Sequence, residues 1–111
     1  MTGTQVDIMA DITLYAWATP NSRRVTIMLQ ELGLSYRIYP VNIRAGDQFR
    51  PPMTMLNPLG KIPVLCWSDD GGTHALAESG AILIALAEHY SALLPVKHGV
   101  RNSVMQWLMV A

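Results

Sequence analysis

A short apolar segment followed at once by a helix-start signal constrains the fold of this chain more than any other sequence feature. Ile12–Ala16 (ITLYA) has the composition of a buried strand. Thr19-Pro20-Asn21 then offers two helix starts, either with Thr19 as the N-cap and Pro20 in the first turn or with Asn21 as the cap. The apolar residues behind this signal have the spacing of one helical face: Val25, Met28, Leu29 and Leu32.

A second strand is expected directly after this helix. Gly33 is a typical helix stop. Tyr36–Val41 returns to strand composition, and Pro40 suits an edge or exit position because it cannot donate to a ladder. A strand, a helix and a strand in this order predict a right-handed unit whose two strands are parallel.

The next part of the chain predicts two antiparallel strands and a helix. After an irregular segment with at most a short helix near Met53–Leu56, the third strand is expected at Ile62–Trp67. Ser68–Gly72 contains Asp-Gly and predicts a tight hairpin with positive φ angles, leading into a fourth strand at Thr73–Ala77. Glu78–Tyr90 predicts an apolar helix, whose sheet-facing positions are Ile82, Leu83 and Leu86, with Tyr90 as a candidate. The predicted fold class is α/β, a βαβ-ββα sandwich with a four-stranded mixed sheet.

The last residues predict a further helix that has no obvious partner in the chain. Val100–Ala111 carries apolar residues at helical spacing, and the sequence stops inside that pattern. One interpretation is a helix docked on the core, and the other, which we favour, is the first helix of an otherwise absent all-α domain. We therefore expect a leader at residues 1–11, one α/β domain at 12–95, and a linker with the start of a truncated helical domain at 96–111. An uncovered apolar helix also predicts self-association or poor solubility.

Composition excludes several classes of function. Eight Lys and Arg balance eight Asp and Glu, and only 14% of residues are charged, which argues against the clustered positive charge of a nucleic-acid binder. The single cysteine, Cys66, excludes an internal disulfide and a CxxC pair, and the three histidines lack metal-ligand spacing. No apolar run approaches the roughly 20 residues of a membrane span, and no secretory signal is recognisable. We expect a cytoplasmic protein without a metal.

Three motifs, in this order on the predicted elements, resemble the N-terminal domain of glutathione transferases. They are TPNSRRV (Thr19–Val25), NPLGKIPVL (Asn57–Leu65) and ESGAILIAL (Glu78–Leu86). The resemblance implies a thioredoxin-like fold. Thr-Pro-Asn after the first strand, with Gly46–Phe49 (GDQF), is most similar to the bacterial nu-class enzymes, which are relatives of the fungal nitrogen-catabolite regulator. Ser22 departs from this subgroup, which usually has glycine at that position.

The resemblance places the catalytic residues at Thr19 and Asn21. Glutathione reacts as a thiolate, whereas an ordinary thiol has a pKa of about 8.5, so donors are needed that stabilise the anion near neutral pH. The Thr19 hydroxyl, the Asn21 amide and the first backbone N–H groups of the helix are suitable donors. The alternative is that Thr19 or Asn21 merely caps the helix.

The resemblance also implies a set of glutathione-binding residues. Glu78 would bind the ammonium of the γ-glutamyl end, and Ser79 with the helix start would bind its carboxylate. The alternative is that Ser79 is an N-cap and Glu78 lies favourably near the positive helix end. The Ile62-Pro63 bond is expected to be cis, so that the Ile62 backbone pairs with the cysteinyl part of glutathione. The weaker candidates, for the glycyl end, are Gln48 and Lys61.

The implied function is activation of the glutathione thiolate for attack on a small electrophile or a disulfide. Glutathione would be the co-substrate, and a homodimer is the expected assembly. A glutathione-binding or regulatory module without turnover is the alternative. The abrupt C-terminal end favours that alternative for this polypeptide, because the electrophile pocket of the family is built largely by its helical domain.

Three further residues need an interpretation. Arg23 and Arg24 place two cations in the first turn of the first helix, where they oppose the helix dipole. Either they are solvated, or they attract an anionic ligand or a neighbouring subunit. Cys66 falls inside a strand and is interpreted as a small buried hydrophobic residue rather than a nucleophile.

Overall fold

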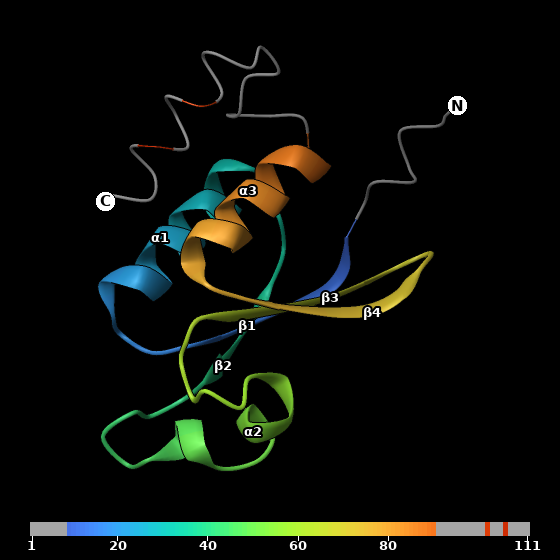
Figure 1. Ribbon diagram of the computed structural model, residues 1–111. Coiled ribbons are helices and arrows are strands. Elements are labelled where there is room, and N and C mark those ends of the chain that lie inside the picture. Colours follow the sequence, from blue (N-terminus) through green and yellow to red (C-terminus); the bar gives the residue numbers. More distant parts are fainter. Residues whose placement is uncertain (1–8, 91–101, 103–105, 107–111) are drawn as a thin grey trace.

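Residues 9–90, Asn102 and Gln106 are described by the structure, which is a computed structural model (Figure 1). The elements follow in the order β1 (Ala10–Ala16), α1 (Pro20–Glu31), β2 (Arg37–Pro40), the 3-10 helix η2 (Asp47–Phe49), α2 (Met53–Leu56), β3 (Val64–Asp69), β4 (Gly72–Ala77) and α3 (Ser79–His89). This order confirms the predicted βαβ-ββα arrangement.

The four strands form one mixed sheet in the order β2-β1-β3-β4. β1 pairs in parallel with β2, and Leu14 lies opposite Ile38. β3 is antiparallel to both β1 and β4. β1 therefore lies inside the sheet, between two strands that come later in the chain. β2 is an edge strand whose residues are all exposed, as Pro40 predicted.

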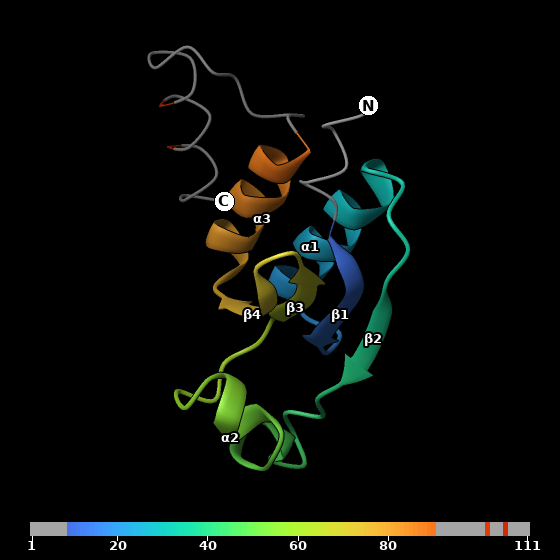
Figure 2. The same cartoon turned by 90° about the vertical axis from the view of Figure 1, so that its right-hand side faces the viewer.

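Helices α1 and α3 cover one face of the sheet, and α2 lies on the opposite side near one end (Figures 1 and 2). The main core lies between the two long helices and the sheet, and burial of each large apolar side chain there stabilises the fold by about 1.5–3 kcal/mol. Its fully buried members are Leu14, Val25, Leu29, Leu65, Ile82 and Leu86. A smaller cluster joins α2 to the other face of the sheet through Val41, Met53 and Val64.

The structure settles the boundaries of α1. Thr19 is the N-cap and Pro20 is the first helical residue, so the first of the two predicted helix starts is confirmed. Gly33 follows the helix with φ of 69°, a left-handed conformation that glycine adopts without penalty. Three positions of the predicted apolar face, Val25, Met28 and Leu29, are buried, and Leu32 packs at the edge of the core.

The ends of the strands differ from the prediction by two residues in three places, one of which is the end of β3 at Asp69 rather than Trp67. β1 begins at Ala10, so it includes the last two residues of the predicted leader. β3 begins at Val64 rather than Ile62, because Pro63 has no N–H to donate to a ladder. In the hairpin, the positive φ of 113° falls on Gly72 rather than on Asp70-Gly71. The Asp69 carboxylate accepts the Gly71 N–H at 2.8 Å and holds this turn instead.

The predicted C-terminal helix lies mostly outside the described residues. Of the segment 100–111, the structure describes Asn102 and Gln106, which are helical and exposed. The expected linker at 96–99 and residues 1–8 of the expected leader also lie outside the described part of the chain. None of the described helices is long and apolar enough to cross a membrane.

Candidate functional site

The register of the sheet brings the three sequence motifs to one end of the molecule. Tyr15, near the end of β1, lies opposite Val64 at the start of β3. Val64 in turn lies opposite Ala77 at the end of β4. The loop after β1, the loop before β3 and the start of α3 therefore meet at the same end of the sheet. These segments carry the predicted site residues Thr19, Asn21, Ile62, Pro63, Glu78 and Ser79.

Thr19 and Ser22 form a closed hydrogen-bonded pair at the start of α1. Thr19 Oγ1 accepts the Ser22 backbone N–H at 3.1 Å, and the Thr19 hydroxyl donates to Ser22 Oγ at 3.0 Å. Ser22 Oγ also accepts the Trp17 backbone N–H at 3.4 Å. Ser22 is only 2% exposed, so water cannot readily compete for these bonds. Thr19 is thus a cap whose single hydroxyl proton is already directed at Ser22.

This arrangement decides which donors remain for a thiolate. The capping interpretation of Thr19 is confirmed, and Thr19 can donate to a ligand only by releasing Ser22. The Asn21 side chain is exposed and has no hydrogen bond to another described residue. Asn21 is therefore a free donor at this helix start, while the donor role of Thr19 remains a prediction.

The loop before β3 presents a free backbone segment. The Ile62-Pro63 bond is cis, as the resemblance implied, and Pro63 is fully buried. Among residues 9–90, neither the N–H nor the C=O of Ile62 has a hydrogen-bond partner. Because β3 starts only at Val64, this one residue before the proline keeps a donor and an acceptor at the end of the sheet.

Asn57 fixes this loop, a role that its sequence motif alone does not indicate. Its amide donates to the Lys61 carbonyl at 3.0 Å, and its Oδ1 accepts the Leu59 N–H at 3.2 Å. Gly60 is held in the same turn with φ of 67°, and a Cβ there would lie 2.6 Å from the ring of Phe49. One sequence signal could have identified Asn57. It is a side chain that both donates and accepts hydrogen bonds, and it stands beside prolines and a glycine where a turn leaves backbone groups unpaired. Lys61 itself is exposed.

Helix α3 begins without a side-chain cap. Glu78 occupies the N-cap position with φ of 74°, which non-glycine residues rarely adopt. The first bond within the helix runs from the Ile82 N–H to the Glu78 carbonyl at 2.9 Å. Ser79 is the first helical residue and makes no capping bond, so the interpretation of Ser79 as an N-cap is wrong. The opening N–H groups of α3 are therefore available to an anion, beside the exposed carboxylate of Glu78.

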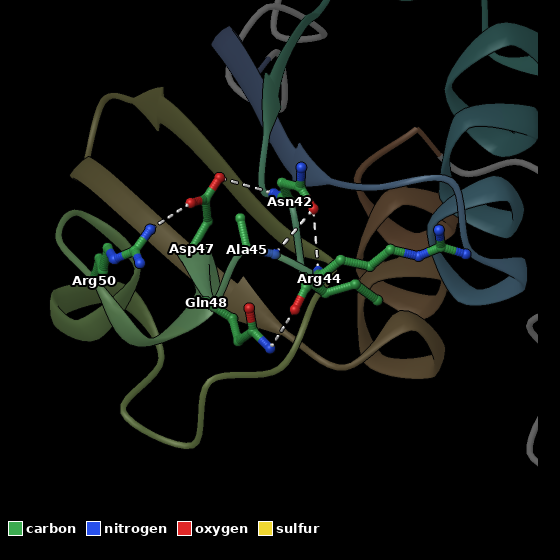
Figure 3. Close-up of polar contacts among 7 residues, drawn as sticks. Asn42, Arg44, Ala45, Asp47, Gln48 and Arg50 are labelled. Carbon is green, nitrogen blue, oxygen red and sulfur yellow. Dashed lines mark hydrogen bonds and ion pairs between the residues drawn. The ribbon is translucent and has the colours of Figure 1, made fainter.

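The segment between β2 and α2 is fixed by its own polar side chains (Figure 3). The Asp47 carboxylate accepts the Asn42 N–H at 3.0 Å and pairs with the Arg50 guanidinium at 3.1 Å. The Gln48 amide group donates to the Ile43 carbonyl at 3.3 Å, and its Oε1 is buried without a partner among the described residues. One of the two N–H groups of the Gln48 amide is thus engaged by the loop, and the other has no partner among the described residues, so the assignment of Gln48 to the glycyl end stays a prediction.

Cys66 has the structural character that the sequence predicted. It lies in β3 between Thr13 of β1 and Ala75 of β4, and it is half-buried. Burial raises the pKa of the Cys66 thiol and opposes formation of its thiolate. Among the residues that the structure describes, no three His, Cys, Asp or Glu side chains are placed to hold a metal ion.

Comparisons with known proteins show the family of this chain. The family model "Glutathione S-transferase, N-terminal domain" matches residues 18–89. The chain is 39% identical over 100 residues to the disulfide-bond oxidoreductase YfcG of Escherichia coli, a match that covers 87% of this chain and 46% of YfcG. The chain thus spans about half the length of this relative.

Solved structures give the same result for the fold. A glutathione transferase family member from Pseudomonas fluorescens, crystallised with two glutathione bound, matches with a TM-score of 0.83 at 37% identity, over 98% of this chain and 47% of that one. A glutathione transferase from Burkholderia graminis, also with two glutathione molecules bound per subunit, matches with a TM-score of 0.83 at 40% identity, over 89% of this chain and 42% of that one. The thioredoxin-like fold is confirmed. The chain therefore belongs to the glutathione S-transferase family, and residues 18–89 match its N-terminal domain.

Proposed function

We propose that this chain binds glutathione and presents its thiolate for attack on a small electrophile or a disulfide. One observation carries the proposal: the unpartnered backbone of Ile62 and the uncapped start of α3 lie at the same end of the sheet. Both are sets of hydrogen-bonding groups that the described residues leave unused, so both are available to a ligand.

The start of α3 fits the γ-glutamyl end of glutathione. That end carries an ammonium and a carboxylate on one carbon, so it needs an anion and an anion-binding group side by side. Glu78 supplies the anion, and the Ser79 hydroxyl with the opening N–H groups of α3 supplies the second partner. The Ile62 N–H and C=O fit the peptide groups of the cysteinyl part, which would place the thiol toward the start of α1 and its donor Asn21.

The two solved structures named above support this proposal, because both contain glutathione and share this fold at 37% and 40% identity. Lys61 is the remaining candidate for the glycyl carboxylate, because its ammonium is exposed and free among the described residues. Gln48 is the second candidate, and the loop uses one of the two N–H groups of its amide.

Calorimetric titration of the chain with reduced glutathione tests the proposal. We expect saturable binding to the wild type and an affinity at least about tenfold lower in Glu78→Ala, because the ammonium loses its charged partner. Glu31→Ala is the matched control, since Glu31 is an exposed glutamate at the far end of α1. Absence of binding to the wild type would contradict the proposed function, and equal binding by both variants would contradict the assigned site.

A second candidate function is a glutathione-binding or regulatory module without turnover. The engaged hydroxyl of Thr19 favours it, because a donor that is already used by Ser22 stabilises a thiolate less well. Rates of glutathione conjugation to a chloronitrobenzene and of reduction of a small disulfide separate the two candidates. Turnover above the uncatalysed rate supports the transferase, whereas tight binding with no turnover supports the module.

The resemblance also implies a cytoplasmic homodimer, and both properties remain expectations. Sedimentation velocity of the purified chain tests the assembly, with a species of twice the monomer mass as the expected result. A concentration-independent monomer would contradict it.

A further inference from the structure

A cavity of about 360 Å³ lies beside the start of α1, on the side that faces the edge strand β2. Its volume is within the range of small-molecule sites, about 300–1,000 Å³. Its walls are mostly apolar, and the side chains that matter here are Trp17, Ile38, Pro40, Thr19, Thr26 and Arg23.

Arg23 is the one charged residue among the described residues that line this cavity. No carboxylate pairs with its guanidinium in the part of the chain that the structure describes. The first turn of α1 also contains no acidic residue, so the positive end of the helix dipole adds to the positive charge of Arg23. The cavity therefore combines an apolar wall with positive charge that no described residue neutralises.

We propose that this cavity binds an apolar molecule that carries one carboxylate or a similar small anion. The guanidinium of Arg23 pairs with the anion, and the side chains of Trp17, Ile38 and Pro40 cover the apolar part. A bound anion removes the repulsion between Arg23 and the helix end as well as adding an attraction, which gives the site a preference for anions over neutral molecules.

The position of the cavity also indicates which kind of ligand it would hold during the proposed reaction. Thr19 lines the cavity and also lies at the helix start where the thiol of glutathione is expected. The ligand of this cavity is then the second substrate, and Arg23 selects for an anionic one. This last step rests on the proposed function, whereas the binding of an apolar anion does not.

Two probes of the same shape test the preference directly: 4-phenylbutyrate and its uncharged amide, 4-phenylbutanamide. Each is titrated into the isotope-labelled chain without glutathione, and the amide resonances of Thr26 and Ile38 report binding. We expect the carboxylate to bind about three- to tenfold more tightly than the amide. In Arg23→Gln we expect this ratio to fall to about one.

Arg24→Gln is the matched control, since Arg24 is the next residue of the same helix but does not line the cavity. It should keep the ratio of the wild type, and Arg23→Lys, which retains the charge, should keep most of it. Equal affinities of the two probes for the wild type, or an equal loss in Arg23→Gln and Arg24→Gln, would overturn the proposal. Separate titration with glutathione distinguishes this inference from the proposed function. If the chain binds glutathione but shows no preference for the carboxylate probe, only the inference is overturned. If it shows the preference but does not bind glutathione, only the proposed function is overturned.

Discussion

Helices α1 and α3 cover the same face of the sheet, yet they begin in opposite ways. α1 has a hydroxyl cap, a proline in its first turn and a buried serine that completes the hydrogen bonding. α3 has no side-chain cap, and its N-cap residue Glu78 has a positive φ. The lack of a side-chain cap makes the start of α3 less stable than a capped start by about 1 kcal/mol. The unfavourable backbone conformation of Glu78 costs roughly 1–3 kcal/mol more.

The first residues of α1 are thus capped by the protein's own side chains, whereas those of α3 are not. A serine at position 78, in place of Glu78, would cap α3 in the way that Thr19 caps α1. The uncapped start of α3 is therefore explained best by a ligand that completes it.

Replacing Glu78 by glycine should change stability and binding in opposite directions. Glycine adopts a φ of 74° without steric penalty, so we expect the free energy of unfolding to rise by about 1 kcal/mol. The affinity for glutathione should fall at least about tenfold, because the carboxylate is lost. Urea denaturation and calorimetry measure the two effects, and Glu78→Ala should reproduce the loss of affinity without the gain in stability. A glycine variant with full affinity would show that Glu78 has no role in binding.

Removing the cap of α1 should destabilise the fold. Thr19→Ala deletes the acceptor of the Ser22 N–H, and we expect a loss of about 1 kcal/mol of unfolding free energy, with Thr19→Ser retaining most of it. The matching change in α3, Ser79→Ala, should have little effect on stability because Ser79 caps nothing. Equal losses from Thr19→Ala and Ser79→Ala would remove the contrast between the two helices.

Much of this contrast could be predicted from sequence, but its decisive details could not. Helical spacing identified the buried face of α1, and Thr19 was one of two candidate caps. The bond from Thr19 to Ser22 depends on side-chain rotamers and burial, which a residue pattern does not specify. The cis bond at Ile62-Pro63 came from the family resemblance alone, because most X–Pro bonds are trans. The engaged amide of Gln48 depends on how its loop closes on Ile43.

Freeing the hydroxyl of Thr19 should have a smaller effect, on the thiol rather than on the fold. In Ser22→Ala the Thr19 hydroxyl loses its acceptor at 3.0 Å and can turn to a bound thiolate. We expect the pKa of bound glutathione to fall by about half a unit, the size of one modest hydrogen bond, measured by thiolate absorbance against pH. Ser35→Ala, at an exposed loop position, is the control. An unchanged or higher pKa in Ser22→Ala would mean that Thr19 does not reach the thiol.

Asp69 contrasts with Glu78, because one oxygen of the Asp69 carboxylate accepts two hydrogen bonds from within the domain. The hydrogen bond from His74 at 2.7 Å, with that from the Gly71 N–H, keeps the pKa of Asp69 below its ordinary value. A carboxyl whose pKa is lower in the folded than in the unfolded chain stabilises the fold above the unfolded pKa, about 3.9, and this contribution is lost as the pH falls through the folded pKa. The stability difference between wild type and Asp69→Asn should therefore shrink below about pH 4. A difference that is constant down to pH 2.5 would contradict the role of this pair.

The central position of β1 also has a consequence for how the protein is made. β1 ends at Ala16, and β3, its antiparallel neighbour, begins at Val64, so the 47 residues 17–63 lie between the two. At a translation rate of about 5–20 residues per second, β1 leaves the ribosome roughly 2–10 s before β3 does. During that interval one edge of an apolar strand has no partner, and such an edge pairs readily with strands of other chains. β1, an interior strand of the finished domain, is thus the strand that waits longest during synthesis for one of its two neighbours.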